Sequence, residues 1–182
     1  MRYAFHSEQW LPYSIERVFA FFANPKNLPR LMPSWQRTRI EEISIVPPPP
    51  PLTISDSARR LSTLIAGAGT RLTLSFRPFP LSPIRLRWQA EIDTFVWNQQ
   101  FSDTQLRGPF AQWHHTHTLT SEDRTGDSGD AIAGTLLRDE VRYQLPFGRL
   151  GELAHPLIAR QLSHTFEYRH RRTRELLAAN FS

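Results

Sequence analysis

The feature that most constrains this fold is an alternation of apolar and polar residues that recurs in successive segments along the middle of the chain. Successive side chains of a strand point to opposite faces, so this period of two indicates strands with one buried and one solvated face. Strands are predicted over residues 71–77, 84–93, 99–106, 110–120 and 132–145. An antiparallel sheet of this kind must cover its apolar face with another element.

The covering element is predicted at the end of the chain, where apolar residues recur at a spacing of three and four over residues 150–177. This spacing places them on one broad stripe of a long helix. The predicted stripe comprises Leu150, Leu153, Leu157, Ile158, Gln161, Leu162, Thr165, Phe166, Arg169 and Leu176. We expect this helix to lie against the sheet.

The N-terminal part is predicted to begin with a strand over residues 2–11, followed by two short helices. The first helix begins after Ser14 as its N-cap, and Asn24-Pro25 ends it. The second occupies residues 26–32. A further strand is predicted over residues 38–46, where β-branched residues are frequent.

These elements together predict an α+β fold in which a curved, seven-stranded antiparallel sheet wraps around the long C-terminal helix. The 182 residues are the size of one domain, so residues 1–182 are expected to form a single unit. A sheet wrapped around one helix tends to leave a cavity between the two layers.

Five consecutive prolines, residues 47–51, interrupt the pattern. Because proline has no backbone donor, we expect an exposed insertion over residues 47–68, with a helical turn around residues 58–65. A loop insertion explains this segment most simply. Docking of an SH3-like partner is the alternative.

Composition excludes several classes of chemistry. The chain has no cysteine, so disulfides, thiolate metal sites and cysteine nucleophiles are absent. The formal charge is +5, but Lys26 is the only lysine and many arginines fall on the wet side of strands, so no nucleic-acid partner is expected. Arg169, Arg171, Arg172 and Arg174 form a cluster that we expect to be solvated, with transient contact to an anionic membrane as an alternative.

No stretch approaches the about 18 apolar residues of a membrane span, and the N-terminus lacks the layout of a signal peptide. The expected compartment is the cytoplasm. The oligomeric state does not follow from these residues.

The order of elements and several motifs resemble the START-like, or SRPBCC, superfamily with its helix-grip fold. The motifs are Phe101-x-Asp103-x-Gln105, Gly108-Pro109-Phe110, Trp113-x-His115-x-His117, Asp139-x-Val141-x-Tyr143 and Leu145-Pro146-x-Gly148, with Val18-Phe19 and Asn27-Leu28 upstream. More narrowly, the chain is similar to a bacterial branch described as cyclase/dehydrase or ligand-binding proteins. The resemblance implies a cavity for a hydrophobic ligand. Because the superfamily includes lipid carriers, coenzyme Q-binding proteins and polyketide cyclases, fold alone does not select a function.

Alternation places a group of polar residues on the inner face of the sheet, among aromatic and aliphatic neighbours. Such a pocket with a few convergent polar groups is typical of a ligand site. The candidate ligand-contacting residues are Trp88, Phe101, Asp103, Gln105, Trp113, His115, His117, Asp139 and Tyr143 from the sheet, with Gln161 and Thr165 from the long helix.

Three roles for the polar group remain open: a structural network, a site for the polar end of a ligand, and catalysis. Catalysis would use His115, His117, Asp139 and Tyr143 to move a proton in a cyclisation or dehydration. His115-x-His117 also has the spacing of two zinc ligands, which Asp139 or His6 would complete. No third histidine is placed there, so we expect neither a metal nor another cofactor.

The function expected from the sequence is binding of a hydrophobic or amphipathic small molecule, such as a lipid, a quinone or a polyketide. A cyclase or dehydratase is the alternative. It ranks second because the sequence has no nucleophile signature and no cofactor-binding fingerprint.

Overall fold

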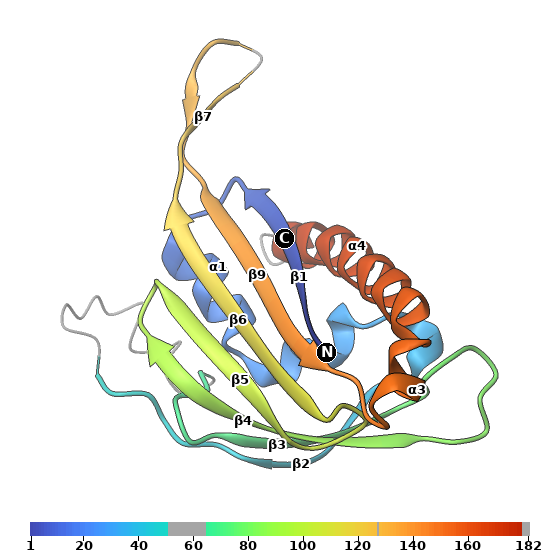
Figure 1. Cartoon of the computed structure of the whole chain (residues 1–182). Helices are drawn as coiled ribbons and strands as arrows, with labels where there is room; N and C mark the ends of the chain where they lie inside the picture. The colour runs from blue at the N-terminus through green and yellow to red at the C-terminus, as the bar shows by residue number, and fades with distance from the viewer. Residues whose placement is uncertain (51–64, 127, 180–182) are drawn as a thin grey trace.

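The computed structural model describes residues 1–50, 65–126 and 128–179. Seven strands form one antiparallel sheet in the order β1-β9-β6-β5-β4-β3-β2. Figure 1 shows the sheet curving around the long helix α4, which covers its inner face. The predicted helix-grip architecture is therefore confirmed.

The strands follow the predicted segments closely. The sheet strands are β1 (Arg2–Leu11), β2 (Arg39–Ser44), β3 (Arg71–Phe76), β4 (Leu86–Val96), β5 (Gln100–Arg107), β6 (Gln112–Ser121) and β9 (Thr135–Gln144). Between β6 and β9 the chain forms a small hairpin of β7 (Arg124–Thr125) and β8 (Ala131–Ile132), where we expected only a loop.

Two short helical segments follow β1, as predicted. Helix α1 (Ile15–Phe22) begins after Ser14 and buries Val18, Phe19 and Phe21. The second is a 3-10 helix, η1 (Pro25–Leu31), in which the side chain of Asn24 accepts a hydrogen bond from the backbone N–H of Lys26. A 3-10 turn, η2 (Ser34–Gln36), leads into β2.

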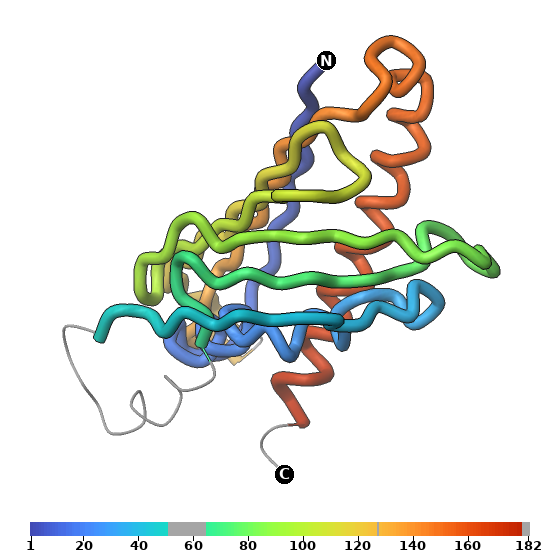
Figure 2. The backbone as a smooth tube through the Cα atoms, turned by 90° about the horizontal axis from the view of Figure 1, so that it is seen from below, coloured from blue at the N-terminus to red at the C-terminus, as the bar shows by residue number. Residues whose placement is uncertain are grey.

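The C-terminal helical region is broken near its start, contrary to the prediction of one helix from residue 150. A short α3 (Arg149–Glu152) precedes α4 (His155–Ala179). The predicted stripe is buried from Leu162 onward, but Leu150, Leu153 and Leu157 are 76%, 80% and 67% exposed. Leu150 and Leu153 leave the stripe because the chain turns at 153–154, and Leu157 in the first turn of α4 is also exposed. Figure 2 shows α3 lying beyond the end of α4.

The proline-rich insertion is only partly exposed. Pro47, Pro49 and Pro50 are exposed as expected. In contrast, Ile65 and Ala66 are buried, and the N–H of Ala66 donates to the carbonyl of Ala23 at 3.0 Å. This end of the insertion is packed because its apolar residues join the core beneath α1. The helical turn predicted around 58–65 lies almost entirely outside the described residues.

Two apolar clusters hold the sheet and the helices together. One gathers α1, the end of α4 and the adjoining ends of the strands, and includes Phe19, Leu137 and Leu177. The other joins Val141 and Tyr143 of β9 to Phe166 of α4. Strand register places the polar residues of β6 and β9 between these clusters, since His117 pairs with Asp139 across the sheet.

Candidate functional site

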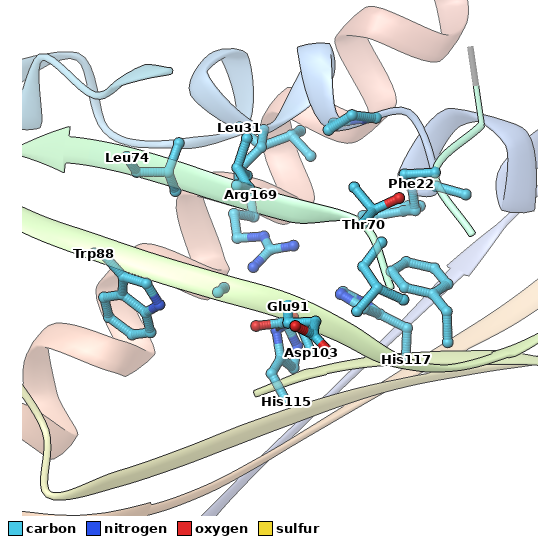
Figure 3. Close-up of a pocket in the computed structure, with 18 residues that line it drawn as sticks. Phe22, Leu31, Thr70, Leu74, Trp88, Glu91, Asp103, His115, His117 and Arg169 are labelled. Carbon is cyan, nitrogen blue, oxygen red and sulfur yellow. Dashed lines mark ion pairs between the residues drawn. The ribbon is translucent and has the colours of Figure 1, made fainter. Parts of the chain in front are cut away.

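Two adjoining cavities lie on the inner side of the sheet, one against α4 and the other mainly against the end of α1 and η1. The larger has a volume of about 440 Å³ and the smaller about 120 Å³. They share the wall residues Leu28, Leu74, Trp88, Asp103, His115 and Arg169. The cavity expected from the fold is therefore present, and Figure 3 shows the polar side chains that line its smaller part.

Aromatic side chains form much of the wall of the larger cavity. The rings of Trp88 and Trp113 are perpendicular, with centroids 4.8 Å apart, and Phe110 packs against Trp113 at 4.9 Å. These residues come from β4, β6 and the turn before β6. They provide a rigid, largely apolar surface of the kind that binds the body of a hydrophobic ligand.

A buried carboxylate connects two histidines at the inner face of the sheet. Oδ1 of Asp139 lies 2.9 Å from Nε2 of His115 and 2.7 Å from Nδ1 of His117. The His115 contact has the geometry of a hydrogen bond, whereas the His117 contact is close without good hydrogen-bond angles. All three side chains are at most 6% exposed.

Burial and neighbouring charges shift the protonation equilibria of this cluster. Burial, assisted by His117, lowers the pKa of His115 from 6.5 to about 4, so this imidazole is neutral at pH 7. Burial alone would raise the pKa of Asp139, but His117 and His115 hold that pKa well below its ordinary value. Asp139 is therefore an anion. It accepts a hydrogen bond from His115 and lies close to the ring of His117.

Asp103 faces this cluster from the neighbouring strand. Its Oδ2 lies 3.7 Å from Nδ1 of His115, its directly opposed residue across β5 and β6. Burial raises the pKa of Asp103, against the opposing effects of His115 and Arg169. The side chain retains 27% exposure, and it lines both cavities.

The sequence analysis gave Arg169 two places, on the apolar stripe of the helix and in an arginine cluster, and the structure bears out the first. It was expected in a solvated arginine cluster, yet it is 9% exposed and its side chain reaches from α4 toward the strand carrying Asp103 (Figure 3). Its guanidinium packs over the ring of Phe166 at 4.9 Å. Within the described residues it makes no hydrogen bond or ion pair. The signal was its place on the apolar stripe, three residues after Phe166.

Most of the predicted ligand-contacting residues line a cavity. Trp88, Asp103 and His115 lie on both walls; Phe101 and His117 line the smaller cavity, and Trp113, Gln161 and Thr165 line the larger. Gln161 also donates to the carbonyl of Pro78 at 3.0 Å. Asp139 lies behind the histidines and is not part of the described cavity lining.

Gln105 and Tyr143 have other surroundings. Nε2 of Gln105 donates to the carbonyl of Phe110 at 2.8 Å, and a Cβ at Gly108 would lie 2.3 Å from its Oε1. Gln105 thus supports the turn between β5 and β6. Tyr143 packs in an aromatic cluster with Tyr3, at a centroid distance of 5.5 Å. Neither is part of the described lining of the two cavities.

Two histidines considered in the sequence analysis face outward. His6 lies on the exposed face of β1, so it cannot join His115 and His117 as a metal ligand. His114 is on the outer face of β6, 3.2 Å from Asp93. No helix in the described part of the chain is long and apolar enough to cross a membrane.

Comparison with known families gives a match along most of the chain. Residues 11–170 match the family described as "Polyketide cyclase / dehydrase and lipid transport". The chain belongs to this family. The START-like resemblance carried by the sequence motifs is thereby confirmed, as is the similarity to cyclase/dehydrase-like proteins.

Solved structures support the same fold for this family member. It resembles TTHA0849 from Thermus thermophilus, with a TM-score of 0.63 and 19% identity over 98% of this chain and 99% of that one. It also resembles CV1439 from Chromobacterium violaceum, with a TM-score of 0.61 and 14% identity over 96% of each chain. A third similar structure is truncated norcoclaurine synthase from Thalictrum flavum, with a TM-score of 0.55 and 16% identity. The match covers 94% of this chain and 92% of that one. A search of curated proteins finds no match.

Proposed function

We propose that this protein binds an amphipathic small molecule, with its apolar body in the larger cavity and its polar end at Asp103, His115 and Arg169. The observation that carries the proposal is a 440 Å³ cavity with mainly apolar walls that ends at buried polar side chains. Cavities of this size accommodate small organic ligands, and a few convergent polar groups fix their orientation.

Arg169 favours an acidic polar end. A buried cation is costly unless it is paired, and among the described residues this guanidinium packs on the ring of Phe166 and acts on Asp103 without a direct ion pair. A ligand carboxylate would supply the missing partner through paired hydrogen bonds. The preferred class is therefore a lipid-like or polyketide-like acid, in preference to a neutral quinone.

A cyclase or dehydratase activity is the second candidate, favoured by the presence of His115 and His117 on the cavity wall. The fold accommodates an enzyme, as the name norcoclaurine synthase indicates for one structural neighbour. However, a base whose pKa is about 4 accepts protons weakly at neutral pH. Tyr143, which could hydrogen-bond a substrate carbonyl in this mechanism, is packed among aromatic rings. We therefore rank binding first.

Native mass spectrometry of untagged protein purified from its own host tests the proposal. We expect an acidic, lipid-like molecule that remains bound under native conditions and is released on unfolding. Absence of any adduct, together with no binding of decanoate or decanol in titrations of tryptophan fluorescence, would contradict it.

A further inference from the structure

Asp103, His115 and His117 form a group that resembles a metal site more than a self-contained polar network. Each offers one potential ligand atom, and the three atoms lie within 4.8 Å of one another. Asp103 comes from β5 and the two histidines from β6, so cross-strand register assembles the group. The two-histidine spacing was evident in the sequence, but the third member lies on the neighbouring strand.

The separation of Asp103 and His115 fits a shared ion better than a direct contact. Their atoms Oδ2 and Nδ1 are 3.7 Å apart, beyond an ordinary hydrogen bond. Two ligands bound to one ion at about 2.1 Å with a tetrahedral angle are separated by about 3.4 Å. Only a small adjustment of either side chain is needed to reach that value.

Asp139 already occupies the position of an outer carboxylate. Its Oδ1 contacts Nε2 of His115 and Nδ1 of His117, which leaves the opposite nitrogen of each ring available. Metal-binding histidines commonly place their second nitrogen on a carboxylate, which fixes the tautomer and the ring orientation. His117 is further fixed by the ring of Phe101, stacked at a centroid distance of 4.4 Å.

The group has space beside it. All three residues line the smaller cavity, and Asp103 and His115 also line the larger one. A site with three protein ligands and a position open to a cavity is the arrangement found in reactive metal sites, as opposed to closed structural ones. Two imidazoles and a carboxylate suit divalent first-row transition metals.

We propose that Asp103, His115 and His117 bind one divalent transition-metal ion, with Asp139 as the outer carboxylate and an open coordination position facing the cavity. The ion would bind without any organic ligand. The proposal shares Asp103 and His115 with the small-molecule binding proposed above, but its test uses the metal ion alone, so either can fail without the other.

Isothermal titration of untagged, chelator-treated protein with Zn²⁺ tests this site, and the visible absorption of added Co²⁺ reports the coordination. We expect one Zn²⁺ per chain with a dissociation constant in the micromolar range or below. Asp103→Asn and His117→Ala should each weaken binding at least 100-fold, and Asp139→Asn about 10- to 100-fold.

His114→Ala is the matched control, because His114 is on the same strand but on its outer face. It should leave the affinity for Zn²⁺ unchanged. Far-ultraviolet circular dichroism checks that each variant is folded, and Asp103→Asn serves as the test if His117→Ala does not fold. The proposal is overturned if folded wild-type protein binds no Zn²⁺ at 100 μM, or if Asp103→Asn binds Zn²⁺ as tightly as wild type.

Discussion

Asp139 and His117 oppose each other directly across β9 and β6, with Oδ1 and Nδ1 2.7 Å apart in the interior of the protein. The same oxygen lies 2.9 Å from Nε2 of His115, two residues along β6. One buried carboxylate therefore contacts two imidazoles. Removal of its charge should affect stability more than removal of a surface carboxylate on the same strand.

Asp139→Asn should lower the free energy of unfolding by about 2–3 kcal/mol, because both histidines lose their anionic partner. Urea denaturation at pH 7 measures this loss. Glu140→Gln is the control: Glu140 is the next residue of β9 and pairs with the exposed Arg142 at 2.8 Å. That change should cost at most about 1 kcal/mol. Equal losses in the two variants would show that Asp139 contributes no more than a surface acid.

Stability should fall as the pH is lowered from 7 toward 4. His115 has a pKa of about 4 in the folded protein against 6.5 unfolded, so its contribution is complete above pH 6.5 and is lost toward pH 4. This loss is on the order of 3 kcal/mol. His170, whose pKa burial lowers, acts in the same direction, and Asp139 extends the loss below its ordinary 3.8.

Asp103 acts in the opposite direction, because burial raises its pKa and its protonation favours the folded state as the pH falls. The effect of His115 is therefore clearest in the upper part of the range. Urea unfolding of wild type and His115→Gln between pH 7 and pH 5 provides the measurement. The variant should show a shallower decline, and parallel curves would exclude His115 as a main source of the pH dependence.

The sheet was predictable because the alternation of each strand encodes its face, and antiparallel register then follows from short connections. Trp88 and His115 could be assigned to the cavity side on this basis, and Thr165 by the helical period of the C-terminal stripe. Asp139 was correctly placed on the inner face, but its position behind the histidines depends on side-chain conformation. The outward turn at Leu153 and Ala154 could not be predicted, because it depends on where the sheet ends.

Arg169 illustrates a conflict between two sequence signals. Its position on the apolar stripe indicated burial, whereas its arginine neighbours indicated solvent, and the second signal was given more weight. Local charge clustering cannot separate the faces of a helix when the cluster spans more than one turn. The helical period can, since Thr165, Phe166, Arg169 and Thr173 are buried whereas Arg171 and Arg174 are exposed.

Arg169→Met should weaken binding of decanoate by at least about 10-fold, because the ligand loses a buried ionic partner. Decanol has the same chain without a charge, and its affinity should be little changed. Arg174→Met is the control on the exposed side of the helix. Titration of tryptophan fluorescence, to which Trp88 and Trp113 in the cavity wall contribute, measures the affinity for each ligand. An equal loss of affinity for decanoate and decanol would indicate disturbed packing instead of charge recognition.

The same variant should be at least as stable as wild type in the absence of ligand. Arg169 makes no direct ion pair among the described residues and interacts with Asp103 only at longer range, so methionine removes a desolvated charge and keeps an apolar side chain in contact with Phe166. Thermal unfolding of the ligand-free proteins tests this expectation. A marked fall in the melting temperature would mean that Arg169 has a structural role beyond ligand binding.

Thr165→Phe should reduce binding of both decanoate and decanol, because the larger ring fills the main cavity from α4. The unfolding free energy should change by less than about 1 kcal/mol, since the added atoms occupy existing space. Ser163→Phe, on the exposed side of α4, is the control and should bind like wild type. A large loss of stability in Thr165→Phe alone would indicate that the cavity is smaller than its 440 Å³ volume suggests.

The central claim is that an acidic amphipathic molecule occupies the space between the sheet and α4, and a crystal structure of the decanoate complex tests it most directly. We predict continuous density for the alkyl chain along Trp88 and Trp113, with the carboxylate in contact with Arg169. Decanoate bound only outside the sheet, or side chains that fill the cavity and exclude it, would contradict the claim.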